Sequence, residues 1–293
     1  MESVSQTLSK ANLATSESSY KPYREMTADE RRAYVQQQCD WYNEEVGNLN
    51  AKDGYECAEC KNRGIIYVPQ ESDNVVTGER DFVMAMRNCK CKAARASIKR
   101  MKESGLGDII ARYTFDRYKA EEKWQANIKQ AAQQFAARDQ GVFFIGGQSG
   151  CGKTHICTAI TSEFLRKRRA AYYMIWQEEV VKLKAVVTDS EEYNRMINRL
   201  KNIDVLYIDD FFKPVGDNPK PTAADIRLAY EIINHRYNSG KFITVISSER
   251  YIQEILEIDE ATGGRIVEYA GGFMFNVQRN HARNYRLRGI MEV

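Results

Sequence analysis

Eight consecutive residues near the middle of the chain have the types and spacing that bind a polyphosphate. Residues 147–154 match the pattern G-x-x-x-x-G-K-[ST]. In such a loop, backbone N–H groups surround phosphate oxygens, the lysine reaches the β- and γ-phosphates, and the final hydroxyl holds Mg²⁺. The glycines allow close backbone approach. The predicted ATP contacts, with Lys153 also catalytic and Thr154 on Mg²⁺, are Gly147, Gln148, Ser149, Gly150, Cys151, Gly152, Lys153, Thr154 and His155.

The flanking residues supply the elements that must position this loop. Residues 141–146 form a short apolar run with aromatic and β-branched members, which predicts a buried parallel strand. Residues 155–168 contain no Gly or Pro and carry apolar residues at helical spacing. A helix that begins here points its N-terminal dipole at the phosphates. The alternative is an ordinary glycine-rich turn.

A second apolar run ends in two acids. Residues 203–208 predict a strand, and Asp209 and Asp210 follow it. Asp209 is placed to bind Mg²⁺, directly or through water, and Asp210 to act as general base toward an attacking water. The alternative is a strand-end turn, where Asp is common.

Composition limits the class of protein. The chain has 293 residues, 43% hydrophobic residues and a net charge of +3, enough for one core domain and a smaller module. This mild charge does not by itself indicate a nucleic-acid partner. No run of 18 apolar residues exists, so we expect no membrane span, and without an apolar N-terminal signal region we expect a cytoplasmic protein. In the cytosol, closely spaced cysteines more often bind metal than form disulfides.

The N-terminal region divides into a tail and a helix. Residues 1–26 are predicted as a disordered tail. Thr27-Ala-Asp-Glu30 resembles a capping box and opens a helix that runs to about Val46. Aromatic side chains along this helix could pack on the rest of the chain or on a partner.

Four cysteines fall in two close pairs, Cys57-x-x-Cys60 and Cys89-x-Cys91. Apolar runs on either side of a polar turn region at 74–78 predict a β-hairpin between the pairs. The base of this hairpin would bring the pairs together, and four thiolates in a tetrahedron suit Zn²⁺. Such a site would be structural, because four protein ligands leave no open position. The alternative is four free or buried thiols.

A basic segment overlaps the second cysteine pair and continues after it. It could be a solvated helix face, or it could contact phosphates of a nucleic acid or an acidic partner. Its members are Arg87, Lys90, Lys92, Arg95, Lys99, Arg100 and Lys102.

Strand and helix patterns alternate from residue 110 to the end. Four strands and the helices between them predict an α/β fold with a parallel sheet in three layers. We therefore expect a helical and zinc-binding module at 27–106 and a nucleotide-binding domain at 110–293.

From Cys57 onward, the pattern resembles the AAA+ ATPases of the DnaC helicase-loader group, close to versions from phages of Gram-positive bacteria and related to the DnaI and IstB ATPases. The resemblance rests on an ordered set of pieces. After the cysteine pairs these are Ser104-Gly-Leu106, Tyr113-Thr-Phe115, Gly147 to Thr154, Ile208-Asp-Asp210, Asn234-His-Arg-Tyr237, Thr244 to Glu249 and Gly264-Arg265-Ile266.

The resemblance implies an ATPase that loads a replicative DnaB-like helicase onto single-stranded DNA in replication initiation. It implies that Arg265 is an arginine finger for ATP on a neighbouring subunit, and hence self-assembly. It places the γ-phosphate sensor at Ser247-Ser-Glu249. The helical segment 177–202 would line the DNA path, with Lys182 and Lys184 as phosphate contacts.

The chain departs from the family pattern in several places. Glu249 stands where many relatives have Asn, and because a carboxylate repels a γ-phosphate we expect it to face elsewhere, with Ser248 as the catalytic sensor. Phe211-Phe-Lys-Pro follows the two acids where a Gly is common. Arg283 and Arg286 are the candidates for a second sensor, and the family's lid domain is short or absent.

Two other functions remain open. An IstB-type transposition helper shares the ATPase core, but such helpers generally lack the cysteine module. A zinc-dependent binding adaptor with a dead ATPase is the second, and the intact Lys153, Thr154, Asp209 and Asp210 argue against it.

Overall fold

The computed structural model describes residues 21–73, 80–101, 107–214 and 220–286. Its internal contacts form two units. The first, here the hairpin unit, takes in Met1–Val46 and Ile65–Asn88. The second, here the sheet unit, takes in Gly47–Gly64 and Cys89–Val293. Most of the predicted tail at 1–26 lies outside the described residues; Tyr23–Glu25 within it form a 3₁₀ helix (η2).

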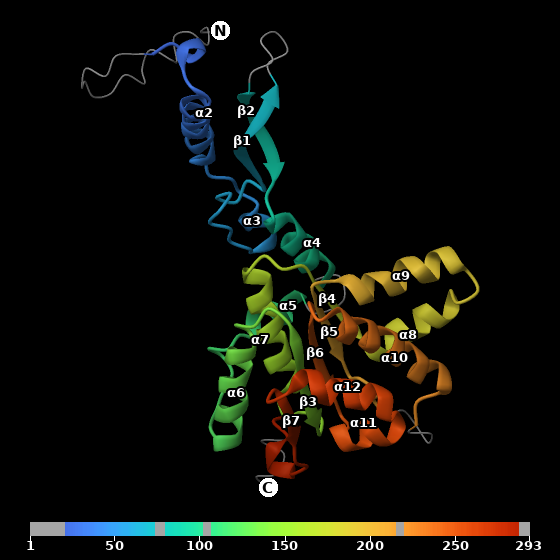
Figure 1. Cartoon of the computed structure of the whole chain (residues 1–293). Helices are drawn as coiled ribbons and strands as arrows, with labels where there is room; N and C mark the ends of the chain where they lie inside the picture. The colour runs from blue at the N-terminus through green and yellow to red at the C-terminus, as the bar shows by residue number, and fades with distance from the viewer. Residues whose placement is uncertain (1–20, 74–79, 102–106, 215–219, 287–293) are drawn as a thin grey trace. The chain divides into compact units, whose positions relative to one another are not determined.

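The hairpin unit consists of one helix packed on two antiparallel strands (Figure 1). Helix α2 (Ala28–Asn43) begins at the predicted capping box, where Thr27 and Glu30 satisfy each other's backbone N–H groups. Strands β1 (Ile65–Asp73) and β2 (Arg80–Asn88) pair with Ile65 opposite Asn88. Asn43 closes the unit, because its amide both donates to and accepts from the backbone of Tyr67, at 2.9 Å each.

The sheet unit is built on five parallel strands in the order β4-β5-β6-β3-β7. The central strands are buried along their whole length, as their unbroken apolar runs predict. Four of the strands are the predicted ones. The strands are β3 (Gly141–Gly147), β4 (Ala171–Ile175), β5 (Val205–Asp209), β6 (Ile243–Ser248) and β7 (Met274–Val277).

Helices cover both faces of this sheet, which gives the predicted three layers (Figure 1). Helix α10 (Ala223–Ser239) begins at a capping box formed by Thr222 and Asp225, and Gly240 in the left-handed conformation caps its C-terminus. The helices are α3 (Asn50–Asp53), α4 (Cys91–Met101), α5 (Gly107–Arg112), α6 (Lys123–Phe135), α7 (Lys153–Arg166), α8 (Trp176–Ala185), α9 (Ser190–Asn202), α10 (Ala223–Ser239), α11 (Ile252–Ile258), α12 (Glu260–Ala270) and the 3₁₀ helix η4 (His281–Arg283).

The cysteine segment belongs to the same compact unit as the sheet. Helix α4 contacts β4 and α7. The hydroxyl of Ser97 on α4 accepts a hydrogen bond from the Ala171 N–H at 3.0 Å, and the Tyr55 hydroxyl lies 3.4 Å from the Arg166 carbonyl. The cysteine segment is thus anchored on the edge of the sheet at β4.

Strand order decides where chemistry can occur. In a parallel sheet the carboxyl ends of all strands lie at one edge, where ligands bind. Because β6 lies between β5 and β3, this edge brings together the loop after Gly147, the acids at Asp209 and the strand end at Ser248. Within the described residues, no helix is long and apolar enough to cross a membrane.

Candidate nucleotide site and cysteine cluster

A cavity of 540 Å³ lies at the carboxyl edge of the sheet, a size that suits a nucleotide. It joins the phosphate loop to the two acids at the end of β5, Asp209 and Asp210, and to residues before and after the sheet. Its lining residues are Ile109, Tyr113, Arg117, Tyr118, Lys119, Ser149, Gly150, Gly152, Lys153, Thr154, His155, Tyr173, Asp209, Asp210, Lys213, Glu249, Tyr285 and Arg286.

The phosphate loop has the backbone that its glycines predict. Gly147, Gly150 and Gly152 have φ angles of 144°, 77° and 93°, a region that side chains disfavour. Gly152 caps the N-terminus of α7, so the positive end of the helix dipole faces the cavity. The Lys153 ammonium is buried and donates to the carbonyls of Gly147 and Gln148, at 2.8 Å each. It is thereby held inside the loop.

The carboxylate of Asp209 is buried at the end of β5 and only 7% exposed. It accepts hydrogen bonds from the hydroxyls of Ser247 and Tyr173, the latter at 3.1 Å. Burial raises the pKa of the Asp209 carboxyl above its usual range, against the opposing effect of these hydrogen bonds. A buried carboxylate of this kind is stabilised by a cation, so the donor set of Asp209 and the Thr154 hydroxyl fits Mg²⁺.

Asp210 lies on the cavity wall in a left-handed conformation, with φ of 55°. Its carboxylate accepts a hydrogen bond from the Lys213 ammonium at 2.8 Å. Asp210 is half-buried and lines the same cavity as Lys153, so its predicted role as general base is compatible with its position.

The three polar residues at and just after the end of β6, Ser247, Ser248 and Glu249, lie in different surroundings. Ser247 holds Asp209. Ser248 is buried and donates to the Phe211 carbonyl at 2.6 Å. It is not one of the described residues that line the cavity. Glu249 does line the cavity, against the expectation that its charge turns it away. The sensor role of Ser248 stays a prediction.

Aromatic side chains form the wall that leads away from the phosphate loop. His155 stacks on Tyr113 with ring centroids 4.5 Å apart, and its ring meets the edge of Tyr118 at 5.2 Å. The His155 Nε2 lies 2.9 Å from the Thr114 carbonyl. Burial lowers the pKa of the His155 ring, so the neutral form is favoured and Nε2–H donates. Such a wall suits a flat base.

The segment after β7 runs against the phosphate loop. Gln148 and Asn280 exchange two hydrogen bonds, of 2.7 and 2.6 Å, and the Tyr285 N–H donates to the Gly150 carbonyl at 3.0 Å. The Arg286 guanidinium lies 3.2 Å from the Ser149 hydroxyl. Of the two candidates for a second sensor, Arg286 therefore lies at the cavity, whereas Arg283 stacks over Trp124.

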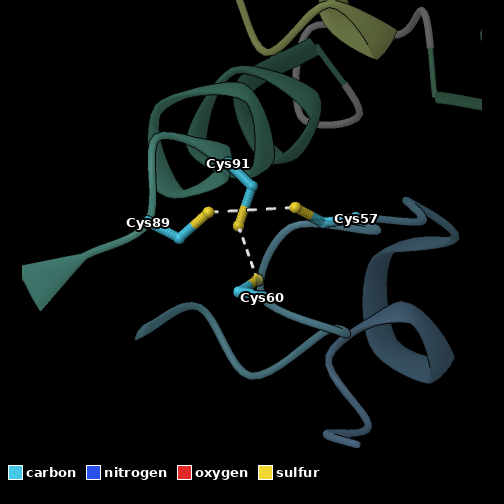
Figure 2. Close-up of side chains that lie close together, drawn as sticks. All are labelled: Cys57, Cys60, Cys89 and Cys91. Carbon is cyan, nitrogen blue, oxygen red and sulfur yellow. Dashed lines mark hydrogen bonds between the residues drawn. The ribbon is translucent and has the colours of Figure 1, made fainter. Parts of the chain in front are cut away.

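The four predicted cysteines come together as one buried cluster (Figure 2). Their sulfurs all lie within 4.8 Å of one another, and the Cys57–Cys89 and Cys60–Cys91 pairs are 3.8 and 3.5 Å apart. Sulfurs around a tetrahedral Zn²⁺ are separated by about 3.8 Å, given Zn–S bonds of about 2.3 Å. The geometry fits that ion.

The surroundings of the cluster favour the thiolate form at Cys60 and the thiol form at Cys91. Burial raises the pKa of Cys60, but the Gly64 N–H, 3.2 Å from its sulfur, and the neighbouring thiols outweigh burial and lower that pKa to about 7. Burial raises the pKa of Cys91 to about 11. Four thiolates packed this closely repel one another unless a cation lies between them, which is the role that Zn²⁺ fills.

The basic segment after the cysteines is partly structural. Arg95 is buried in α4 and makes two bonds to the Asp53 carboxylate, of 2.5 and 2.6 Å, and one of 2.9 Å to Asn62. Its charge is used inside the fold, so it is not a free phosphate contact. The predicted contribution of Lys102 lies outside the described residues.

Three further predicted residues, Lys182, Lys184 and Arg265, have partners within the chain. On α8, Lys182 lies 3.3 Å from Glu179, and Lys184 lies 2.6 Å from Asp225 on α10. Arg265 on α12 is half-buried, donates to Asn234 at 2.8 Å and lies over the ring of Tyr230. None of the three lines the cavity as described here.

Sequence patterns missed several residues of this site, among them Tyr173, Lys213 and Tyr285. Ser247 belongs to the predicted sensor segment, but the sequence does not predict its hydrogen bond to Asp209. Lys213 lies close in sequence to the two acids, and the strand order would have placed it at the site. Tyr173 is itself one of the buried residues of β4, so its place in the apolar pattern gives no separate signal. Tyr285 lies beyond the missed strand β7, so nothing in the sequence connected it with the phosphate loop.

Comparison with known proteins agrees with this geometry. Residues 109–268 match the bacterial DnaA ATPase domain family. The phage-like element PBSX protein XkdC of Bacillus subtilis (strain 168) is 30% identical over 249 residues, covering 80% of this chain and 88% of that protein. The replicative helicase loader DnaC of Escherichia coli (strain K12) is 26% identical over 111 residues, covering 36% of this chain and 45% of that protein.

Among solved structures, the crystal structure of the DnaC helicase loader covers 57% of this chain and 96% of its own, with 16% identity and a TM-score of 0.47. The family match spans the phosphate loop, Asp209, Asp210 and Arg265. The resemblance read from the ordered motifs is therefore confirmed: the chain belongs to the bacterial DnaA ATPase domain family and is a DnaC-like AAA+ protein.

Proposed function

We propose that this protein hydrolyses ATP and loads a replicative DNA helicase onto single-stranded DNA in replication initiation. One observation carries the proposal: a single cavity contains Lys153, Thr154, Asp209 and Asp210. These residues supply the groups that one chain contributes to hydrolysis: a phosphate-binding cation, two metal-binding groups and a general base. The loading role is supported by the name of the matched relative from Escherichia coli, a replicative helicase loader.

The proposed chemistry is an in-line displacement at the terminal phosphorus. Lys153 leaves its two loop carbonyls and binds the β- and γ-phosphates. Asp210 accepts a proton from water while the water oxygen bonds to the γ-phosphorus and the bond to the ADP oxygen breaks. When bound to Thr154 and Asp209, Mg²⁺ supplies positive charge next to the phosphates.

Arg265 is proposed to complete the site of a neighbouring copy. An arginine finger stabilises the charge of the transition state and is worth about 10³ to 10⁵ in rate. In the isolated chain the guanidinium is occupied by Asn234 and the ring of Tyr230. Self-assembly would replace these neutral partners with a phosphate, which binds a guanidinium more strongly.

We further propose that the cysteine cluster binds one structural Zn²⁺ through Cys57, Cys60, Cys89 and Cys91. Support comes from the sulfur spacing and from the burial of all four side chains. The N-terminal region is proposed to dock on a DnaB-like helicase. Single-stranded DNA would lie along α8 and α9, where phosphates compete with Glu179 and Asp225 for Lys182 and Lys184.

A turnover assay on the full chain tests the hydrolytic part. Phosphate release is measured with Mg²⁺-ATP, with and without single-stranded DNA, and compared with a Lys153→Ala variant. We expect clear turnover from the native chain and at least a hundredfold less from the variant, about 3 kcal/mol of lost transition-state stabilisation. Equal rates in the two would leave the chain a binding adaptor with a dead ATPase.

The loading part needs a purified bacterial replicative helicase and a single-stranded circle. Recovery of helicase on the circle is measured with ATP, without ATP, and with the Lys153→Ala variant. We expect recovery to depend on the native chain. The full chain is used because a fragment ending at 106 would divide the sheet unit. Stimulation of a transposase on duplex DNA, with no effect on the helicase, would favour the IstB-type alternative.

A further inference from the structure

Two departures from the family pattern meet at the nucleotide cavity. Lys213 stands in the turn after Asp209 and Asp210, and Glu249 stands at the end of β6. The Lys213 ammonium lies 2.8 Å from a carboxylate oxygen of Asp210 and 3.5 Å from one of Glu249. All three side chains line the cavity and are between 25% and 35% exposed. Lys213 therefore links the proposed base to the acid at the strand end.

The turn that carries Lys213 has an unusual backbone. Asp210 and Phe212 have φ angles of 55° and 51°, although neither is glycine. A bulky residue in this region is strained, and such strain persists only where neighbours fix the conformation. Phe211 and Phe212 stack on each other at 4.2 Å and are buried beside Trp176, so the core holds the turn in place.

Hydrogen bonds fix the same turn from two sides. Ser248 donates to the Phe211 carbonyl at 2.6 Å, and the Arg250 guanidinium donates to the Phe212 carbonyl, also at 2.6 Å. From α8, the Gln177 amide donates to the Lys213 carbonyl at 3.2 Å. The backbone of Lys213 is thus held in place, and the two carboxylates at 2.8 and 3.5 Å fix the position of its ammonium.

The position of the Lys213 ammonium matters because of the other charges in the cavity. Asp210 and Glu249 are two carboxylates beside a loop built to bind a polyanion, and each repels a phosphate. Burial lowers the pKa of Lys213, but the hydrogen bond and charge of Asp210, with the charge of Glu249, outweigh it and raise that pKa above its usual value. Lys213 therefore stays cationic at neutral pH.

We propose that Lys213 is a positioning residue of the nucleotide site, an inference that rests on the proposed ATPase function. Its ammonium orients Asp210 toward the attacking water. It also neutralises Glu249, so that a carboxylate can occupy this strand end without repelling the terminal phosphate. Lys213 and Glu249 thus act as a pair whose opposite charges offset each other in the cavity, so their effects on nucleotide binding should be coupled.

A double-mutant cycle on the full chain tests the pairing. Affinity for a non-hydrolysable ATP analogue with Mg²⁺ is measured for the native chain, Lys213→Ala, Glu249→Gln and the double variant. Lys213→Ala should weaken binding about tenfold, because it leaves Glu249 charged and unneutralised. Adding Glu249→Gln should recover most of that loss. The same loss with and without Glu249→Gln would overturn the pairing.

Turnover separates the two effects of Lys213. In the double variant the KM for ATP should return close to the native value, while kcat stays at least tenfold low because Asp210 has lost its orienting ammonium. Lys213→Arg should keep both parameters near native. A native kcat in Lys213→Ala would contradict the positioning of Asp210. Lys220→Ala, at an exposed lysine later in the same connection, is the matched control and should change neither.

The two proposals fail in different ways. If the native chain binds the analogue but releases no phosphate, the ATPase proposal falls, while the binding cycle still reports whether Lys213 and Glu249 are coupled. If the chain hydrolyses ATP and the cycle is additive, the ATPase proposal stands and the inference falls. Melting temperatures verify that each variant folds, and Lys213→Gln, which keeps much of the side-chain stem, replaces any alanine variant that does not.

Discussion

At the scale of single residues, neighbouring hydroxyls at the end of β6 have separate tasks. Ser247 donates to the buried Asp209 carboxylate, whereas Ser248 donates to the backbone of Phe211. Removing the Ser247 hydroxyl takes away a hydrogen bond that stabilises the ionised acid, so the pKa of Asp209 should rise further. A less ionised Asp209 is a weaker ligand for Mg²⁺.

We therefore expect Ser247→Ala to raise the Mg²⁺ concentration needed for half-maximal nucleotide binding about five- to tenfold, the effect of one lost charge-assisted hydrogen bond. Titration of Mg²⁺ at fixed nucleotide measures it. Ser248→Ala is the matched control and should instead destabilise the fold by about 1 kcal/mol. The reverse pattern would support the sequence-based assignment of Ser248 to the γ-phosphate.

His155 should give the fold a dependence on pH. Burial lowers the pKa of its ring below the ordinary value of 6.5, although the Thr114 carbonyl opposes this shift. Between 6.5 and the lower native pKa the unfolded chain binds more protons than the folded one. The contribution of the neutral His155 ring to the free energy of unfolding is therefore complete above pH 6.5, and it is lost as the pH falls through the native pKa.

Melting temperatures at pH 7.5 and 5.5 measure this effect. The native chain should lose more stability on acidification than His155→Gln, because the variant has no ring to protonate. His281→Gln, at an exposed histidine outside the aromatic wall, should behave like the native chain. Equal losses in the native chain and His155→Gln would show that the ring does not contribute.

At the scale of elements, the cysteine cluster holds the start of α4 against the loop that carries the first cysteine pair (Figure 2). Because α4 in turn contacts β4 and α7, the cluster should stabilise the whole sheet unit. We expect the purified protein to contain about one zinc per chain and to melt at a lower temperature after chelation.

Metal content by mass spectrometry and thermal melting together measure the zinc prediction. Cys91→Ser should lose the metal and much of the stability. Cys39→Ala, at a buried cysteine of α2 outside the cluster, should retain the metal in full. Native zinc content in Cys91→Ser would show that the four thiols do not form the predicted site.

The elements differ in how far local sequence could predict them. The phosphate loop, its strand and its helix carry their signals within one short stretch, and Asp209 with Asp210 follow another apolar run. Strand β7 has only four residues, two of them half-buried, so its pattern is too short to recognise. Lys213 and Glu249 meet because the turn that follows β5 has φ of 51° at Phe212. Phenylalanine rarely adopts this conformation, so the sequence does not predict the turn.

At the scale of the whole molecule, a neighbouring chain is proposed to supply Arg265 to the nucleotide site. Arg265 does not line the cavity of its own chain in the described structure, and its guanidinium lies over Tyr230 on α10. If Arg265 acts in trans, an assembly needs one subunit with an intact Lys153 and a neighbour with an intact Arg265. The two functions can then be supplied by different chains.

Mixing two inactive variants tests this division. Lys153→Ala cannot bind the phosphates and Arg265→Ala cannot supply the finger, so each alone should hydrolyse ATP at least a hundredfold more slowly than the native chain. In an equal mixture, sites formed by an intact Lys153 and a neighbouring intact Arg265 should turn over. Phosphate release from the mixture should therefore exceed the sum of the two variants several-fold, and should fall on dilution as assemblies dissociate. A mixture no faster than that sum, or an Arg265→Ala variant with native activity, would return Arg265 to its ordinary role as a surface residue packed on Tyr230.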